Sequence, residues 1–152
     1  MRLPIIGLLG AMLLVGCQPR PSSVDNAWIR LSAVQGRPAA AYFALDPGQE
    51  SRILLSVKTP IAIRSELHES MAMAGGPSTS SGGTVMSMKP FAQLPIPAGE
   101  RVTFAPGGKH VMLFDVAPSV KPGDTAKLVF IFADGATLEA DAKVLAAGDP
   151  AP

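Results

Sequence analysis

The stretch KLVFIFADGATLEADAKV, from Lys127 to Val144, decides the fold. Two runs of strand-forming residues flank Asp134 and Gly135, a pair that readily adopts the positive backbone φ of a tight hairpin turn. Apolar and polar residues alternate again after the turn, as they do in a strand with one buried face. The stretch therefore predicts a β-hairpin near the carboxyl end of the chain.

The rest of the chain repeats this pattern of short apolar runs separated by Pro, Gly and Asp, and no segment shows convincing helical periodicity. Short, closely spaced strands together with 15 Pro and 15 Gly favour a single all-β domain, a Greek-key sandwich or barrel, over a helical or α/β fold. We expect this domain to span residues 27–145. Its predicted strands cover residues 27–31, 40–45, 52–58, 62–69, 85–90, 101–104, 110–116, 126–132 and 137–144.

The first 16 residues have the features of an export signal. Arg2 precedes an apolar run, residues 3–15, that is short for a membrane-spanning helix, and small residues lead to Cys17. Residues 14–17 resemble a bacterial lipobox, which implies cleavage before Cys17, lipid attachment to it, and a place on the periplasmic side of a membrane. The following Gln18 resembles an outer-membrane sorting signal. The alternative is an ordinary thiol after an uncleaved segment.

These features bound the remaining organisation and the partners. Residues 17–26 would form a lipidated tether and residues 146–152 a disordered tail. A lipidated Cys17 cannot form a disulfide, so stability must come from core packing. A net charge of +1 without a Lys or Arg cluster argues against nucleic acid as a partner. We expect membrane contact through the lipid alone.

Every methionine after the signal segment, and both histidines, lie within residues 68–112. Side chains two residues apart in a strand share a face, which pairs Met86 with Met88 and His110 with Met112. His68 shares its face with polar residues that do not look like core. Each methionine alone is better explained as a core filler, and a lone histidine as a structural residue. The clustering of both types instead favours one metal site.

Thioether and imidazole ligands together select copper. Thioethers are soft and uncharged, which suits Cu(I) and gives little affinity for Zn²⁺, Mg²⁺ or Ca²⁺, and imidazole also suits copper. A cysteine would bind Cu(I) more tightly, but outside the cytoplasm it is exposed to oxidation. A neutral ligand set holds copper less firmly than thiolates do, which favours a carrier. A blue-copper electron carrier is disfavoured, because it needs a cysteine thiolate.

At these residues the chain resembles a known family, the periplasmic copper chaperones called PCuAC. The family motif places a histidine, a methionine about ten residues later, and then HxM after a further 21 residues. Met88 and His110 enclose 21 residues, and the last two ligands fall on His110 and Met112. The first falls on His68 in ELHES. The stretches AWIR, AAYFAL, MSMKP, PAGE, PGGKHVMLF and KPGDTAKLVF extend the likeness over nearly the whole domain.

The chain departs from the family motif between its first two ligands. Residues 69–87 separate His68 from Met88, about nine more than the motif allows, and the surplus coincides with a Gly/Ser/Thr-rich segment that we expect to be a mobile loop. A longer loop costs little entropy, so the site should survive. Whether Met86 or Met88 is the ligand stays open, and Met71, Met73 and Met86 are candidate auxiliary ligands. The tail lacks the His and Met that would add a Cu(II) site.

The resemblance implies a cupredoxin-like β-sandwich that binds Cu(I) in the periplasm and is not an enzyme. It also implies a copper acceptor, either the CuA subunit of cytochrome oxidase or a Sco-type thiol protein, with copper passing by ligand exchange. One alternative is a copper-scavenging or tolerance lipoprotein with the same site and no delivery partner. Another is a metal-free β-sandwich lipoprotein whose methionines only pack. Buried methionines and well-separated histidines would favour that second alternative.

Overall fold

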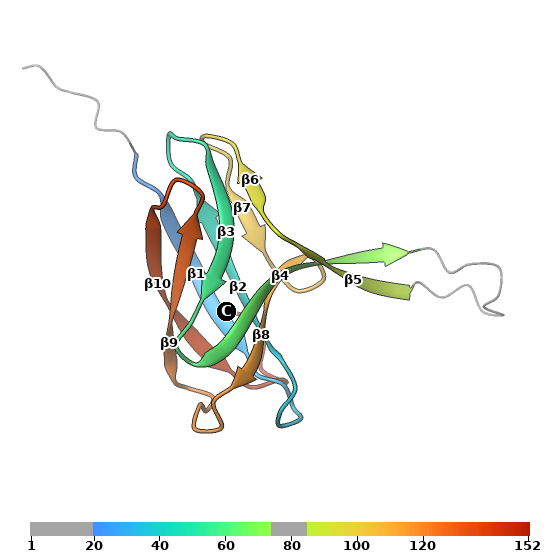
Figure 1. The fold of residues 1–152 in the computed structure, drawn as a ribbon. Helices are drawn as coiled ribbons and strands as arrows, with labels where there is room; N and C mark the ends of the chain where they lie inside the picture. Colours follow the sequence, from blue (N-terminus) through green and yellow to red (C-terminus); the bar gives the residue numbers. More distant parts are fainter. Residues whose placement is uncertain (1–19, 74–84) are drawn as a thin grey trace, which may run out of the picture.

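The computed structural model describes residues 20–73 and 85–152, and these form ten strands and no helix (Figure 1). The strands are β1 (Ser23–Arg30), β2 (Ala39–Asp46), β3 (Arg52–Lys58), β4 (Ala62–Met73), β5 (Val85–Phe91), β6 (Leu94–Ile96), β7 (Val102–Phe104), β8 (Lys109–Val116), β9 (Thr125–Phe132) and β10 (Thr137–Leu145). The all-β prediction is confirmed. Within the described part, no helix is long and apolar enough to cross a membrane. The signal segment and Cys17 lie outside the described residues.

The strands pair in the order β5-β4-β8-β2-β1-β10-β9-β3-β6, with β7 also paired to β2. Only β1 and β10 run parallel among the described pairs. The sheet is not closed. It folds over itself into two layers, since Phe43 on β2 meets Phe130 on β9 with ring centroids 4.7 Å apart. The fold is therefore a single-domain β-sandwich.

Alternation along the strands divides each of them between an inner and an outer face. On β2 the residues Ala39, Ala41, Phe43 and Leu45 are all at most 2% exposed. Phe43 also stacks on Phe104 of β7, with ring centroids 4.3 Å apart. The neighbouring β4 and β8 contribute Leu67, Val111 and Leu113 to the same core. The alternate residues of β4 and β8, whose side chains point the other way, consequently lie on the outer face of this layer.

The predicted hairpin between β9 and β10 is confirmed. Gly135 has a φ of 82°, and the two strands pair from Ile131 opposite Thr137 to Thr125 opposite Lys143. The carboxylate of Asp134 accepts a hydrogen bond from the backbone N–H of Ala136 at 2.9 Å. This hairpin supplies Leu128, Phe130 and other fully buried side chains of the second layer.

The strands β1 and β6 differ from the prediction. β1 begins at Ser23 rather than at residue 27, so part of the predicted tether pairs with β2. The pairing is interrupted by a bulge between Asp25 and Trp28, where Asn26 has a φ of 50°, and the bulge hides the alternation from the sequence. The strand β6 was missed because it contains Pro95, which is tolerated only where a strand lies at a sheet edge.

The hairpin of β4 and β5 is longer than expected. The strand predicted at residues 62–69 is too short, because β4 continues to Met73, whereas β5 begins at Val85 as predicted. Figure 1 shows this hairpin extending away from the sandwich. Backbone pairing from Leu67 opposite Phe91 to Met73 opposite Val85 accounts for the extension. The remaining Gly/Ser/Thr-rich residues, 74–84, lie outside the described part.

The tail after Leu145, for which the sequence predicted disorder, contacts the outer face. The carboxylate of Asp149 accepts a hydrogen bond from the backbone N–H of Ala146 at 2.8 Å. The Arg30 guanidinium donates to the Asp149 carbonyl oxygen at 2.9 Å and lies over the Trp28 ring. These contacts place the first residues of the tail beside β1 and a small aromatic cluster.

Candidate metal centre

The two histidines are direct neighbours across two strands. His68 on β4 pairs with His110 on β8, and their ring centroids lie 5.9 Å apart. The residues that flank each of them in sequence, Leu67 and Val111, are buried in the core. Because side chains alternate along a strand, both rings lie on the outer face of this layer. The structure thus brings together the first and third ligands that the sequence predicted.

Met112 joins the histidines on this face. It lies two residues after His110 on β8 and pairs with Glu66 on β4, which in turn lies two residues before His68. The four residues form a block, two from each strand. Within such a block the diagonal neighbours are about 7–8 Å apart at Cα, within reach of a long side chain. Met112 is therefore placed to bind the same metal ion as both histidines.

Met88 completes the predicted set from β5. It pairs with Ser70 on β4, while Pro90 pairs with His68, so Met88 is a diagonal neighbour of His68. Its side chain is 60% exposed. By contrast, His110 is only 5% exposed. The four predicted ligands therefore range from a buried imidazole at one end to an exposed thioether at the solvent boundary.

The other three methionines occupy different register positions. Met71 pairs with Ser87, one residue out of step with Ser70 and Met88, and so it lies on the opposite face of the hairpin. Met86 pairs with Ala72 and Met73 with Val85, both further from the histidines along the ladder than Met88 is. The side chains of Met73 and Met86 are outside the described part of the structure. The register therefore places Met88 nearer to His68 than Met86.

A local hydrogen bond orients the ring of His110. Its Nδ1 lies 3.0 Å from the carbonyl oxygen of Gly108, which can only accept, so Nδ1–H donates and Nε2 keeps its lone pair. Tyr42 packs beside this ring, with centroids 6.5 Å apart, and Trp28 packs on Tyr42 at 4.4 Å. The backbone and two aromatic rings thus hold His110 with one nitrogen free for a metal.

His68 is oriented by a side chain instead. Its Nε2 lies 3.0 Å from Oε2 of Glu66, a carboxylate oxygen that accepts the Nε2–H. Its Nδ1 is buried and has no hydrogen-bond partner among the described residues. Burial, followed by the positive charge of Arg64, lowers the pKa of His68 below 6.5. His68 is therefore neutral at pH 7, with a lone pair that no described protein group satisfies.

These donors fit a soft, monovalent cation. A buried acceptor without a partner is costly, and a metal ion would satisfy Nδ1 of His68 directly. The described residues contain no group of three or more His, Cys, Asp or Glu that could hold a metal, so any site here needs the thioethers of Met88 and Met112. Two imidazoles with two thioethers suit Cu(I).

Sequence reasoning missed how Glu66 takes part. It noted only a polar residue on the face of His68, whereas the structure shows Glu66 bonded to that histidine and paired with Arg64. The Arg64 guanidinium also lies over the Phe114 ring, 3.8 Å from its centroid. The alternation of Arg64, Glu66 and His68 along one strand is the signal that points to this chain of contacts.

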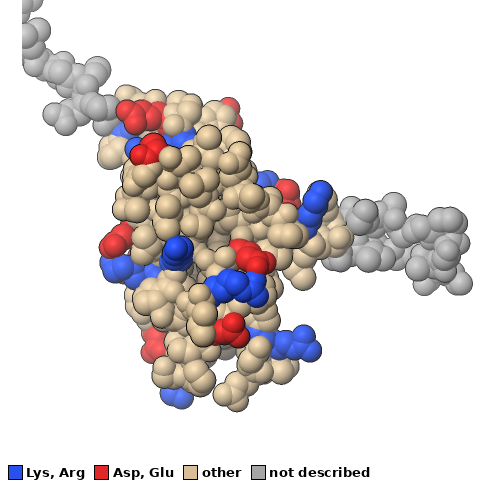
Figure 2. All heavy atoms as spheres, viewed as in Figure 1, with Lys and Arg blue, Asp and Glu red and all other residues tan. Residues whose placement is uncertain are grey.

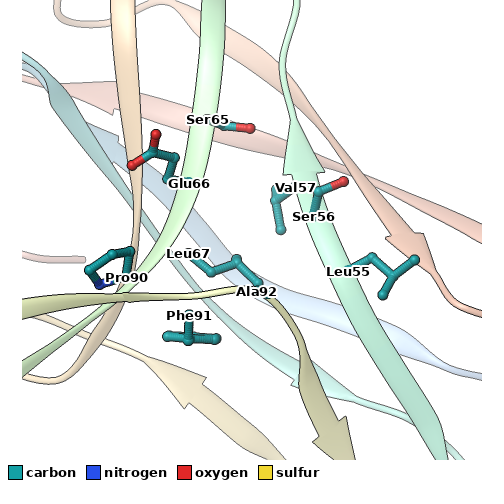
Figure 3. A pocket seen from close by; sticks show the side chains of 9 residues that line it. All are labelled: Leu55, Ser56, Val57, Ser65, Glu66, Leu67, Pro90, Phe91 and Ala92. Atoms are coloured by element: carbon teal, nitrogen blue, oxygen red, sulfur yellow. The ribbon is translucent and has the colours of Figure 1, made fainter.

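A mostly apolar cavity lies beside the site, and the surrounding surface carries charges of both signs (Figure 2). A cavity of about 430 Å³ lies between β3 and β4, lined by Leu55, Leu67, Phe91 and other residues (Figure 3). Glu66 lies in its wall and accepts a hydrogen bond from His68. Figure 2 shows acidic and basic side chains interspersed over the visible face, without a patch of one sign. This distribution offers no extended phosphate-binding surface on that face.

Comparison with known proteins places these features in a family. Residues 23–144 match the family described as putative lipoprotein LpqE-like. A relative, the putative lipoprotein Lxx21020 of Leifsonia xyli subsp. xyli, is 28% identical over 122 residues, which cover 80% of this chain and 68% of the relative.

Solved structures share the fold. The copper-bound PCuAC domain from PmoF2 has a TM-score of 0.62 at 20% identity, and the match covers 86% of this chain and 97% of that domain. The solution structure of CuI-DR1885 from Deinococcus radiodurans has a TM-score of 0.55 at 28% identity, covering 86% and 83%. Its apo form has a TM-score of 0.57 at 25% identity, covering 96% and 93%. The resemblance to PCuAC domains predicted from the sequence is confirmed.

Proposed function

Because this chain belongs to the LpqE-like family of putative lipoproteins and shares the fold of PCuAC domains, we propose that it is a copper chaperone that holds Cu(I) between β4, β5 and β8. One observation supports this most strongly. His68 and His110 are paired across two strands, and the hydrogen bond of each ring leaves its other nitrogen free. The relative DR1885, at 28% identity, has a Cu(I)-bound structure.

The proposed ligands are His68, Met88, His110 and Met112. The imidazoles are held by the Glu66 carboxylate and the Gly108 carbonyl, so they are preorganised before the metal arrives. Thioethers favour the monovalent state of copper, because a soft neutral ligand suits a soft cation. No substrate bond is made or broken, and the chain acts by binding and release.

Release should begin at Met88. It is the most exposed of the four ligands, at 60%, so a partner can reach it without opening the core. A thiolate from the acceptor would replace this thioether first, and copper would then pass through a shared intermediate to the stronger site. We propose the CuA subunit of cytochrome oxidase, directly or through a Sco-type protein, as acceptor. Lipid attached to Cys17 would hold the carrier at the periplasmic side of a bacterial membrane.

Copper binding can be tested by titrating the domain with Cu(I) against a competing chelator. We expect Met88→Ala, Met112→Ala and each histidine-to-alanine variant to bind more weakly than the parent, and the quadruple variant to lose binding. Equal affinity of the quadruple variant and the parent would refute the site. X-ray absorption identifies the sulfur ligand on β5: the sulfur count should fall in Met88→Ala and stay unchanged in Met86→Ala.

Delivery needs a separate experiment. The copper-loaded domain is mixed with a CuA domain or with a Sco-type protein, and mass spectrometry follows the metal. We expect copper to leave the carrier for at least one of them. Retention of copper by the carrier in both mixtures, together with normal oxidase assembly and copper sensitivity in a deletion strain, would instead indicate a tolerance protein.

A further inference from the structure

We propose that Glu66 is a positioning residue for His68 and that Arg64 opposes it, so that this pair sets how tightly the site holds Cu(I). The inference rests on the proposed function, because it concerns the same metal. It goes further by assigning roles to two residues that supply no ligand atom. The Arg64–Glu66 pair is defined by the ion pair between the guanidinium of Arg64 and Oε1 of Glu66.

Glu66 lies against two proposed ligands at once. Its Oε2 accepts the Nε2–H of His68 at 3.0 Å, and its backbone pairs with Met112 on β8. It also lies two residues before His68 on the same face of β4. The carboxylate is therefore fixed beside the metal position without being a soft ligand itself.

The hydrogen bond has two consequences for binding. It sets the tautomer of His68, because the proton on Nε2 leaves the lone pair on the buried Nδ1. It also makes the imidazole a stronger donor, as carboxylates bonded to metal-binding histidines do. In addition, the negative charge of Glu66 compensates a cation that would otherwise be held by neutral ligands only. The stronger donor and the negative charge both strengthen binding.

Arg64 acts in the opposite direction. It occupies the second oxygen of Glu66, and its guanidinium is held over the Phe114 ring at 3.8 Å from the centroid. A fixed positive charge at this position lowers the pull of the carboxylate on the imidazole and repels the incoming cation. Because both side chains of the pair are more than one third exposed, their ion pair by itself adds little to stability. A chaperone that must release copper benefits from such attenuation.

Three substitutions separate these effects. In Glu66→Leu the acceptor and the charge are lost, and we expect Cu(I) affinity to fall about 10- to 100-fold. Glu66→Gln keeps an acceptor oxygen without the charge, so the loss should stay below about tenfold. Arg64→Met keeps an apolar stem over Phe114 without the positive charge, and affinity should rise about two- to fivefold. Chelator competition measures all three.

A second measurement needs no copper. His68 and His110 are the only histidines of the chain, so ¹H–¹⁵N correlations of the imidazole rings in the metal-free protein are simple to assign. The Nε2–H signal of His68 should be protected from exchange in the parent and in Glu66→Gln, and should lose that protection in Glu66→Leu. A residue that only stabilised the strand would not change this signal.

The matched control is Glu139→Gln, which removes the same charge from the ion pair between Lys127 and Glu139 on β9 and β10. It should leave both affinity and ring signals unchanged. Affinity of Glu66→Leu within twofold of the parent, or a protected His68 signal in that variant, would overturn the role of Glu66. Unchanged or weaker binding by Arg64→Met would overturn the role of Arg64. A parent chain that binds no copper would refute the proposed function itself.

Discussion

Replacing His68 should separate metal binding from stability, because its buried, unpaired ring nitrogen lowers the free energy of unfolding of the metal-free protein. Its Nδ1 is buried without a partner among the described residues, and an unsatisfied buried acceptor costs about 1–3 kcal/mol. His68→Leu removes this penalty but also loses the hydrogen bond to Glu66, which is worth a similar amount. The two changes offset each other, so the metal-free variant should be within about 1 kcal/mol of the parent.

The neighbouring Leu67 provides the contrast. It is 3% exposed on the inner face, and Leu67→Ala should cost about 2–5 kcal/mol through the lost packing and the cavity left behind. Yet it provides no ligand, so copper binding should remain. The two substitutions, one residue apart on opposite faces of β4, are expected to give opposite patterns.

Thermal unfolding with and without buffered Cu(I) reads out both patterns. With free copper at about 100 times Kd, a ligand that binds only the folded state adds about 2.7 kcal/mol. At roughly 3 °C per kcal/mol for a domain of this size, the parent Tm should rise by about 8 °C. Leu67→Ala should start lower and show the same rise, while His68→Leu should start near the parent and show none. A destabilisation above about 3 kcal/mol in metal-free His68→Leu, or a full copper response in it, would refute this reasoning.

Three further outcomes are expected. Met88→Ala should speed the transfer of Cu(I) to an acceptor and weaken binding, whereas Met71→Ala, on the other face of the hairpin, should leave stopped-flow transfer rates unchanged; equal effects would contradict the register argument. Burial and the charge of Arg64 lower the pKa of His68, so at acidic pH the unfolded chain binds more protons than the folded chain. The metal-free free energy of unfolding, measured by urea titration, should therefore fall as the pH drops from 7.5 to 5.5. The fall should be smaller in a variant that lacks this histidine. Gly48 has a φ of 76°, and a Cβ there would lie 2.4 Å from the carbonyl oxygen of Arg20, so Gly48→Ala should destabilise by at least about 1 kcal/mol in the same titrations, and an unchanged midpoint would contradict the close approach.

Much of the fold was predictable because its signals are local. The Asp134–Gly135 turn and the alternation on β9 and β10 specify their hairpin within a few residues. β1 was partly missed because the bulge at Asn26 breaks the alternation, and residue propensities do not predict where a bulge occurs. β6 was missed because Pro95 has no backbone N–H to donate, so a strand tolerates it only at a sheet edge, and where the sheet ends is not a local property of the sequence.

The site was predictable in its composition but not in its arrangement. Alternation along β8 assigned His110 and Met112 to one face, and the family spacing added His68 and Met88. Which residue faces which across two strands depends on register, and His68 and His110 are too far apart in sequence for local patterns to fix it. Alternation along β4 places Glu66 on the same face as His68, but the hydrogen bond between them depends on side-chain conformation, which the sequence pattern does not determine.

The two faces of β4 and β8 also explain why a long insertion can lie between the first two ligands. Leu67 and Val111 on the inner face are buried in the core, and this packing fixes the register of the two strands. That register alone determines that His68 meets His110 on the outer face. The hairpin beyond Ser70 adds only Met88 to the set, from a position that pairing with β4 already fixes.

Extra residues at the far end of the hairpin can therefore lengthen the connection without moving any of the four ligands, since loop closure costs rise only with the logarithm of length. Shortening the connection, by deleting residues 76–82, should accordingly leave Cu(I) affinity within about twofold in chelator competition, and a larger loss would show that the insertion itself contributes to binding.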